Sequence, residues 1–170
     1  MSYRITGTGS CIPDIAKKNS DFLKNKFLDT DGGKFQTSNS EIIDKFNSIT
    51  GIYERRYAPD EINCSDLAAV AAGLAINDSK LDQETLDYII VAHNTGDISC
   101  SSGQVDTLPS VASKVKAKLK IKNPNCVAYD IICGCPGWVE GIIQAKSFIK
   151  SGMAEKCLVI GCDTLSRILD

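Results

Sequence analysis

The feature that most constrains this chain is the alternation of short β-branched runs with longer helix-like stretches. Three runs are typical of buried strands, Tyr88–Ala92, Cys126–Ile132 and Lys156–Cys162, and helical stretches near residues 109–120 and 136–151 separate them. Such alternation is typical of parallel strands joined by right-handed crossover helices. The sequence therefore predicts an α/β fold with a mixed, mainly parallel sheet.

The N-terminal part of the chain adds further predicted elements. Tyr3–Gly7 is predicted to be a first strand, and Ser40–Ser48 a helix that Gly51 ends. Residues 65–77 are predicted to form an alanine-rich helix, which allows another backbone to approach closely. Residues 96–107 are polar and are predicted to form a long loop that is functional or mobile.

Composition places the chain among soluble globular proteins and excludes several partners. Its 170 residues are 43% hydrophobic, and 19 Lys and Arg against 21 Asp and Glu leave a net charge of -2. No basic face is therefore expected to neutralise a nucleic acid. The first residues do not form a signal peptide, and no apolar run approaches the roughly 18 residues that span a bilayer. The sequence predicts a cytoplasmic protein with neither a nucleic-acid nor a membrane partner.

The chain has eight cysteines at irregular spacings. In a reducing compartment they are expected to be free thiols, most of them packed as small apolar side chains. Cys133 and Cys135 are close enough in sequence to chelate a metal or form a redox pair. The lone histidine, His93, and the lack of a matching cysteine pair argue against this, so we predict no metal and no cofactor. His93 itself is interpreted as a polar residue at a strand end rather than a base.

The segment Asp130–Val139 carries the strongest chemical signal, because a buried-looking strand stops there and a helix begins within four residues. Pro136 suits the first helical position, which makes Cys135 the predicted N-cap. The helix dipole and the free backbone N–H groups would stabilise a thiolate at that point. The following helix is apolar nearly all round, which predicts burial on most sides. Spacing alone leaves two interpretations of Cys135 open, a nucleophile or one more small buried residue.

The residues Asp130, Cys135, Gly137 and Trp138 resemble the Asp-x-x-x-x-Cys-x-Gly-aromatic nucleophile segment of the β-ketoacyl-[acyl-carrier-protein] synthase III family, within the thiolase superfamily. Other blocks of the chain resemble that family in the same order: Ile5–Ser10, Thr50–Ile52, Glu54–Arg56, Ile90–Ala92, Ser151–Gly152, Leu158–Gly161 and Asp163–Ser166. The resemblance covers only the N-terminal half of such a protein. It implies that residues 1–170 are the first half of a thiolase-like αβαβα sandwich with a buried central helix.

The resemblance implies a reaction and its partners. Cys135 would accept an acyl group from a thioester, carried by coenzyme A or by acyl carrier protein (ACP). It would then pass the group to malonyl-ACP in a decarboxylative Claisen condensation of fatty acid or polyketide-type synthesis. Backbone amides, that of Cys135 among them, would hold the oxyanion. Family members add a His and an Asn from their second half, so these 170 residues alone are not expected to condense. A homodimer is also implied.

One departure from the family, one further interpretation and one alternative function accompany this interpretation. The stretch Asp44–Ile49 lacks the Trp and Arg with which family members grip the adenine of coenzyme A, which favours an acyl group on carrier protein. Five lysines at alternate positions from Lys114 to Lys122 are interpreted as a solvated helix end rather than a docking patch for acidic carrier protein. The alternative function is a non-catalytic partner subunit of a ketosynthase heterodimer, against which the retained Cys135 argues.

Overall fold

The computed structural model describes residues 3–168, and the chain divides into two compact units. The larger unit comprises Met1–Ile12 and Ala58–Asp170, and the smaller unit is Pro13–Tyr57. Within residues 3–168, no helix has both the length and the hydropathy needed to cross a bilayer.

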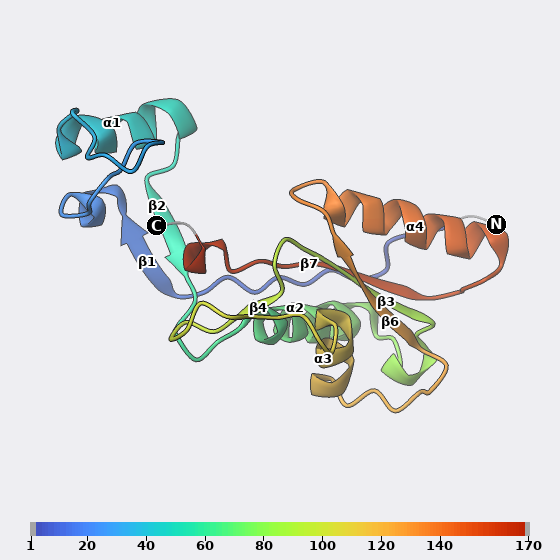
Figure 1. The fold of residues 1–170 in the computed structure, drawn as a ribbon. Coiled ribbons are helices and arrows are strands. Elements are labelled where there is room, and N and C mark those ends of the chain that lie inside the picture. The colour runs from blue at the N-terminus through green and yellow to red at the C-terminus, as the bar shows by residue number, and fades with distance from the viewer. Residues whose placement is uncertain (1–2, 169–170) are drawn as a thin grey trace. The chain divides into compact units, whose positions relative to one another are not determined.

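A three-stranded parallel sheet forms the centre of the larger unit (Figure 1). Strand β3 (Tyr88–His93) lies between β6 (Val127–Ile132) and β7 (Cys157–Gly161), so the order is β6-β3-β7. The middle strand is almost wholly buried, because it is covered on both faces. The three predicted strands and their parallel arrangement are confirmed.

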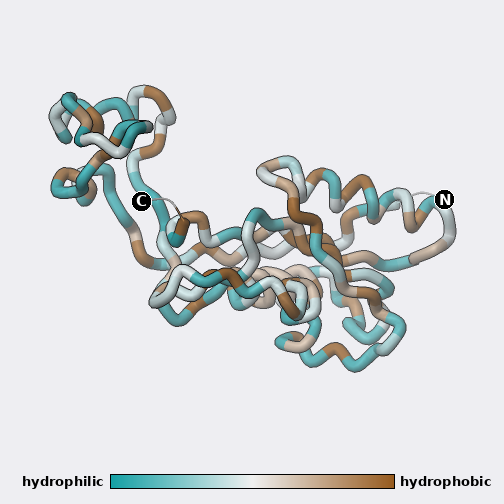
Figure 2. The backbone as a smooth tube through the Cα atoms, in the orientation of Figure 1, coloured by the Kyte–Doolittle hydropathy of each residue, from teal (hydrophilic) through white to brown (hydrophobic). Residues whose placement is uncertain are grey.

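Helices cover both faces of this sheet, with α4 (Gly137–Ser151) on one side and α2 (Cys64–Ser79) and α3 (Val111–Lys118) on the other (Figure 1). The alternation of side chains along β3 divides its residues between the two faces. Ile89 and Val91 join the main apolar cluster with α2 and α3. Figure 2 shows hydrophobic stretches along the strands of this sheet. The three predicted helices of this unit are confirmed.

A short hairpin lies in the stretch that was expected to be a long loop. Strands β4 (Asp97–Ile98) and β5 (Val105–Asp106) pair in antiparallel fashion. The hairpin places the buried Asp97 carboxylate against the start of α2, where it accepts hydrogen bonds from Ser65 N at 2.7 Å and Ser65 Oγ at 2.9 Å. One strand carboxylate thus satisfies a backbone N–H group that the helix itself leaves free.

The prediction of a first strand at Tyr3–Gly7 is wrong. Residues 3–13 are irregular, and the backbone at Gly7 and Gly9 runs so close to α2 that a Cβ at either position would collide with it. Thr8 N donates to the Asp78 carboxylate of that helix at 2.9 Å. The two glycines favour this close approach to a helix, so the segment packs there instead of pairing with the described strands.

The alternating lysines are not a uniformly solvated helix end, which corrects that interpretation. Three of them bind groups within the larger unit, because α3 and the turn after it bring acceptors within reach. Lys114 Nζ contacts the carboxylates of Asp97 and Asp106, Lys116 Nζ donates to the carbonyls of Asn123 and Cys126, and Lys118 Nζ pairs with Asp66.

The smaller unit consists of one helix and a two-stranded antiparallel ribbon. Strands β1 (Ile15–Lys18) and β2 (Glu54–Tyr57) pair in register, and α1 (Asn39–Thr50) lies between them in sequence. Gly51 ends α1 with a φ of 68°, the left-handed conformation typical of a glycine helix cap. The predicted helix at Ser40–Ser48 and its end at Gly51 are confirmed.

Three short 3-10 helices complete the described chain: η1 (Asn19–Phe22), η2 (Gln83–Thr85) and η3 (Leu165–Arg167).

Candidate functional site

The turn between β6 and α4 places Cys135 at the carboxyl edge of the parallel sheet. Gly137 N donates to the Gly134 carbonyl at 2.9 Å, which closes a turn with Cys135 and Pro136 at its corner. Before the turn, Cys133 N donates to the His93 carbonyl at 3.3 Å and extends the pairing of β6 with β3. In parallel α/β sheets this edge, where strands give way to helices, is where ligands bind.

The helix N-cap is Pro136 and not Cys135, so the predicted cap is wrong by one residue. Pro136 already has a nearly helical φ of −77°, and its carbonyl accepts from Glu140 N at 3.1 Å. The proline therefore begins the hydrogen-bond ladder itself. Cys135 lies in the turn just before the cap.

The thiol of Cys135 is free and exposed. The interpretation of Cys135 as one more small buried residue is therefore wrong. In the part of the chain that the structure describes, no side chain forms a hydrogen bond with Cys135 Sγ. The group beside the thiol is the N-terminus of a 15-residue helix, whose first N–H groups have no acceptor within the helix. Such a helix end favours negative charge on a nearby sulfur or oxygen.

Small residues bring the start of α4 close to the sheet. A Cβ at Gly137 would lie 3.2 Å from Ala92 Cβ, and one at Gly141 would lie 2.8 Å from Val159 Cγ1. Side chains at these positions would push the helix outward and carry the turn with it. The glycines therefore fix the position of Cys135 relative to the strand ends.

The opposite face of α4 differs from the expectation of burial on most sides. Gly137, Gly141 and Ala145 are buried against the sheet. The apolar side chains on the other faces, Trp138, Val139 and Ile143, are 48%, 52% and 48% exposed. Within the described chain, the helix is therefore covered on its sheet-facing side only.

A polar pair lies beside the turn. Asn94, just after β3, donates from its backbone N to Asp163 Oδ1 at 2.9 Å and from Nδ2 to Asp163 Oδ2 at 2.7 Å. The Asn94 Oδ1 atom lies 3.6 Å from where a Cβ at Gly134 would be. These hydrogen bonds join the ends of β3 and β7 and hold the asparagine next to the cysteine turn.

His93 and Asp130 form a buried pair beneath the site. His93 Nε2 lies 3.0 Å from Asp130 Oδ2, and His93 is 3% exposed. The same carboxylate accepts hydrogen bonds from Val111 N at 2.7 Å and Ala112 N at 2.8 Å, the first residues of α3. Burial raises the pKa of Asp130, but the hydrogen bonds from His93 and the two backbone N–H groups outweigh it, so the pKa lies below its ordinary value. His93 itself is the last residue of β3, so it lies at a strand end.

The capping of α3 by Asp130 was not predicted from the sequence. A signal was present, because an ionisable residue within an otherwise apolar strand needs a partner when the strand is buried. Cys133, the other cysteine of the segment, has its Cβ beside Gly137. Among residues 3–168, no three His, Cys, Asp or Glu side chains are grouped as ligands for a metal ion.

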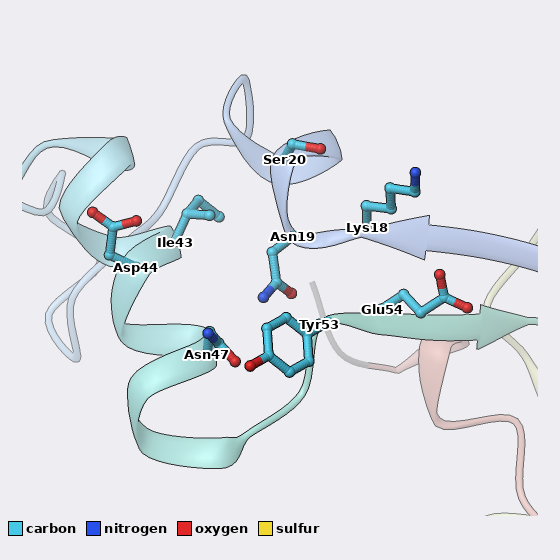
Figure 3. Close-up of a pocket in the computed structure, with 8 residues that line it drawn as sticks. All are labelled: Lys18, Asn19, Ser20, Ile43, Asp44, Asn47, Tyr53 and Glu54. Carbon is cyan, nitrogen blue, oxygen red and sulfur yellow. The ribbon is translucent and has the colours of Figure 1, made fainter.

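The smaller unit has a pocket of its own, of about 400 Å³ (Figure 3). Figure 3 shows the side chains of Asn47 and Tyr53 turned toward one another at its centre. Asp44 and Asn47, from the stretch Asp44–Ile49, line one wall. Most of the lining side chains are polar or charged, and none of them is a cysteine, so the pocket offers no thiol.

Comparison with known proteins finds a family that is similar to the segment around Cys135. The family described as 3-oxoacyl-[acyl-carrier-protein (ACP)] synthase III matches residues 129–170, which include Cys135 and α4. The whole chain is 39% identical to the β-ketoacyl-[acyl-carrier-protein] synthase III of Neisseria gonorrhoeae and 37% identical to one from Vibrio parahaemolyticus. The chain covers 47% and 46% of these two proteins, so it spans about half the length of the curated relatives that it matches.

Solved structures agree with this match. The 3-oxoacyl-[acyl-carrier-protein] synthase III of Aquifex aeolicus superposes on 98% of this chain with a TM-score of 0.74 and 34% identity, over 46% of its own length. The corresponding synthase of Thermus thermophilus gives a TM-score of 0.75 and 30% identity over 99% of this chain and 45% of its own. The predicted fold, the N-terminal half of a thiolase-like α/β protein, is confirmed.

Proposed function

Because the chain belongs to the 3-oxoacyl-[acyl-carrier-protein] synthase III family, whose N-terminal half it matches, we propose that it carries the acyl-accepting nucleophile of such an acyltransferase. The nucleophile is Cys135. The observation that supports this assignment is its free, exposed thiol in the turn that begins α4, at the carboxyl edge of the parallel strands.

In the proposed first step, Cys135 Sγ attacks the carbonyl carbon of an acyl thioester. A carbon–sulfur bond forms, the carbonyl oxygen becomes an oxyanion, and collapse of this intermediate expels the thiol of the carrier. Backbone N–H groups at the helix start stabilise the oxyanion, and the helix dipole stabilises the thiolate that attacks. The product is an acyl group bound to Cys135.

The second step proposed is the condensation of that acyl group with malonyl-ACP, in fatty acid or related synthesis. Loss of carbon dioxide from the malonyl group supplies the carbanion that attacks the acyl carbon, and Cys135 leaves as the free thiol. The residues described here provide the acylated cysteine. The steps at the malonyl group are proposed for the family's complete catalytic domain, of which this chain covers about half.

The donor is proposed to be acyl-ACP, with acyl-CoA as the competing donor. The stretch Asp44–Ile49 offers neither an indole ring nor a guanidinium to hold the adenine of coenzyme A. We further propose that the protein acts in the cytoplasm as a homodimer.

The test of the proposed function is mass spectrometry of the chain after incubation with an acyl thioester. We expect a gain of one acyl mass that maps to the peptide containing Cys135. The Cys135→Ala variant should lose this gain, since no other thiol lies in the same turn position. Acyl-ACP and acyl-CoA, used in separate incubations, should differ in rate, with acyl-ACP faster.

The matched control is Cys133→Ala, which removes a thiol from the same segment and keeps Cys135. This variant should be acylated like the unmodified chain. Acylation that persists in Cys135→Ala would assign the nucleophile to another cysteine. A folded chain that gains no acyl mass with either donor would favour the non-catalytic partner subunit instead.

A further inference from the structure

Two cysteine sulfur atoms meet inside the larger unit. Cys64 is the first residue of α2, and Cys162 directly follows β7. Their Sγ atoms lie 2.9 Å apart, although 98 positions separate them in the chain. A disulfide bond is about 2.05 Å long, so the two sulfurs need to move together by less than about 1 Å to bond. Among residues 3–168, no other pair of cysteine sulfurs is in such contact.

The backbone on each side of this pair is held in place. Cys162 N donates to the Ala92 carbonyl at 3.0 Å, which continues the pairing of β7 with β3. Next to Cys64, Ser65 is anchored to the buried Asp97 carboxylate through both its N and its Oγ. The two sulfurs therefore face each other from rigid positions, and their contact does not depend on a flexible loop.

The two thiols differ in exposure and in hydrogen-bonding role. Cys64 is completely buried, whereas Cys162 is partly exposed. Cys64 donates its S–H to Cys162 Sγ, so the sulfur of Cys162 is the one that presents a lone pair. The contact with Cys162, together with burial, raises the pKa of the Cys64 thiol well above its ordinary value. Cys162 is thus the sulfur that a small oxidant reaches first, and Cys64 is the neighbour that keeps its proton.

We propose that Cys64 and Cys162 form a reversible disulfide when the chain reacts with hydrogen peroxide. Cys162 Sγ attacks one peroxide oxygen, the O–O bond breaks, and the products are a sulfenic acid on Cys162 and one molecule of water. Cys64 Sγ then attacks the sulfenic sulfur, the S–OH bond breaks, and the Cys64 proton leaves with the hydroxyl as a second water. The two thiols are oxidised by two electrons, and the peroxide is reduced.

The disulfide would link the start of α2 to the end of β7. Asp163, the residue after Cys162, holds Asn94 beside the cysteine turn, so the link forms one residue from that contact. A reducing compartment would return both cysteines to thiols, which makes the link a response to oxidation and not a permanent brace. This proposal does not depend on the acyl-transfer function proposed above.

The experiment is to treat the folded chain with hydrogen peroxide, remove the oxidant, alkylate the remaining thiols under denaturing conditions and map the peptides without reduction. Trypsin releases Cys64 in the peptide 57–80, and Cys162 in the peptide 157–167. We expect these two peptides to appear linked, with two fewer alkylated thiols than the eight of the untreated chain. Dithiothreitol should separate the peptides again.

Because peptide 157–167 also contains Cys157, the Cys157→Ser variant is the matched control and should keep the link. Among residues 3–168, Cys157 Sγ forms no hydrogen bond with another cysteine sulfur, so removing it should leave the contact between Cys64 and Cys162 in place. Cys162→Ser, at the partly exposed position, should abolish the link without disturbing the buried residue, and Cys64→Ser should leave a sulfenic acid on Cys162. The proposal is overturned if peroxide oxidises the exposed Cys135 while peptides 57–80 and 157–167 remain separate, or if the link survives in Cys162→Ser.

Discussion

Asp130 performs two tasks with one carboxylate. It lies in β6, where it accepts hydrogen bonds from two N–H groups at the start of α3 and contacts His93 of the neighbouring strand. The helix start needs acceptors that the helix cannot supply, and a carboxylate satisfies them better than a neutral group. Asp130 therefore joins β3, β6 and α3 directly below the cysteine turn.

Replacing Asp130 by Asn should lower the free energy of unfolding by about 1–3 kcal/mol at neutral pH, because an amide cannot accept all three hydrogen bonds. Folding lowers the pKa of Asp130, so its contribution is present above the ordinary pKa of an aspartate and is lost as the pH falls through the folded value. Urea denaturation at several pH values should show the largest difference at neutral pH and a shrinking one below about pH 4.

The control for this substitution is Asp106→Asn. Asp106 also binds a cation, Lys114 Nζ at 2.8 Å, but its side chain is 61% exposed. We expect this variant to unfold at nearly the same urea concentration as the unmodified chain. If both variants lowered the free energy of unfolding equally, the lower exposure of Asp130 would make no difference to its contribution to stability.

The position of helix α4 depends on small residues along its sheet-facing side. Gly141 is the tightest point, with Val159, Ile90 and Ile131 around the space that a side chain would enter. Glycine in a helix is less favourable than alanine by about 1 kcal/mol, so its presence here reflects packing rather than helix stability.

Gly141→Ala should therefore destabilise the chain, by about 1–3 kcal/mol, despite the better helix propensity of alanine. Gly73→Ala in α2 is the matched control, since the nearest atom to its Cβ would be Leu119 Cδ2 at 3.7 Å. The free energy of unfolding of this control variant should rise by up to about 1 kcal/mol. Chemical denaturation of both variants measures the contrast, and a stabilised Gly141→Ala would contradict the close contact.

The elements that sequence predicted well are those with a local pattern. The strand around Ile90 and the helix after Pro136 follow from runs and periodicity within a few residues. Tyr3–Gly7 was misjudged because strand propensity says nothing about packing of its glycine onto α2. The hairpin Asp97–Asp106 was missed, since strands of two residues within a polar stretch leave no repeating pattern.

For the candidate site, the sequence correctly predicted that Cys135 lies between a strand and a helix, because neighbouring residues form that junction. It could not assign the cap, since Pro136 takes that role only once the turn closes on Gly134. The contact between Cys64 and Cys162 could not be predicted from the sequence either. The fold brings together two residues that are 98 positions apart and share no local sequence pattern.

Across the larger unit, Arg167 joins segments that lie far apart in sequence. Its guanidinium donates to Asn63 Oδ1 at 2.8 Å and to the Ile98 carbonyl at 2.7 Å. It also donates to three carbonyls just before α2, those of Pro59, Asp60 and Ile62. One cation thus satisfies acceptors from the loop before α2 and from β4.

Arg167→Met should lower the free energy of unfolding by about 1–3 kcal/mol, because partly buried acceptors lose a charged donor. Arg167→Lys should recover only part of this loss, since an ammonium cannot reach the same set of carbonyls. Denaturation followed by circular dichroism measures both. Arg56→Met is the control, because Arg56 pairs with Glu54 on the surface of the smaller unit, where such pairs contribute little. An Arg167→Met midpoint equal to that of this control would contradict the assignment.

The antiparallel pairing of β1 with β2 has a practical consequence. Ile15 lies opposite Tyr57, so the chain enters and leaves the 13–57 segment through neighbouring strand ends. We therefore expect that a short reverse turn from Ile12 to Ala58 can replace this segment. Comparing acylation of the shortened protein with that of the intact one would then test whether residues 13–57 are needed for the acylation proposed at Cys135.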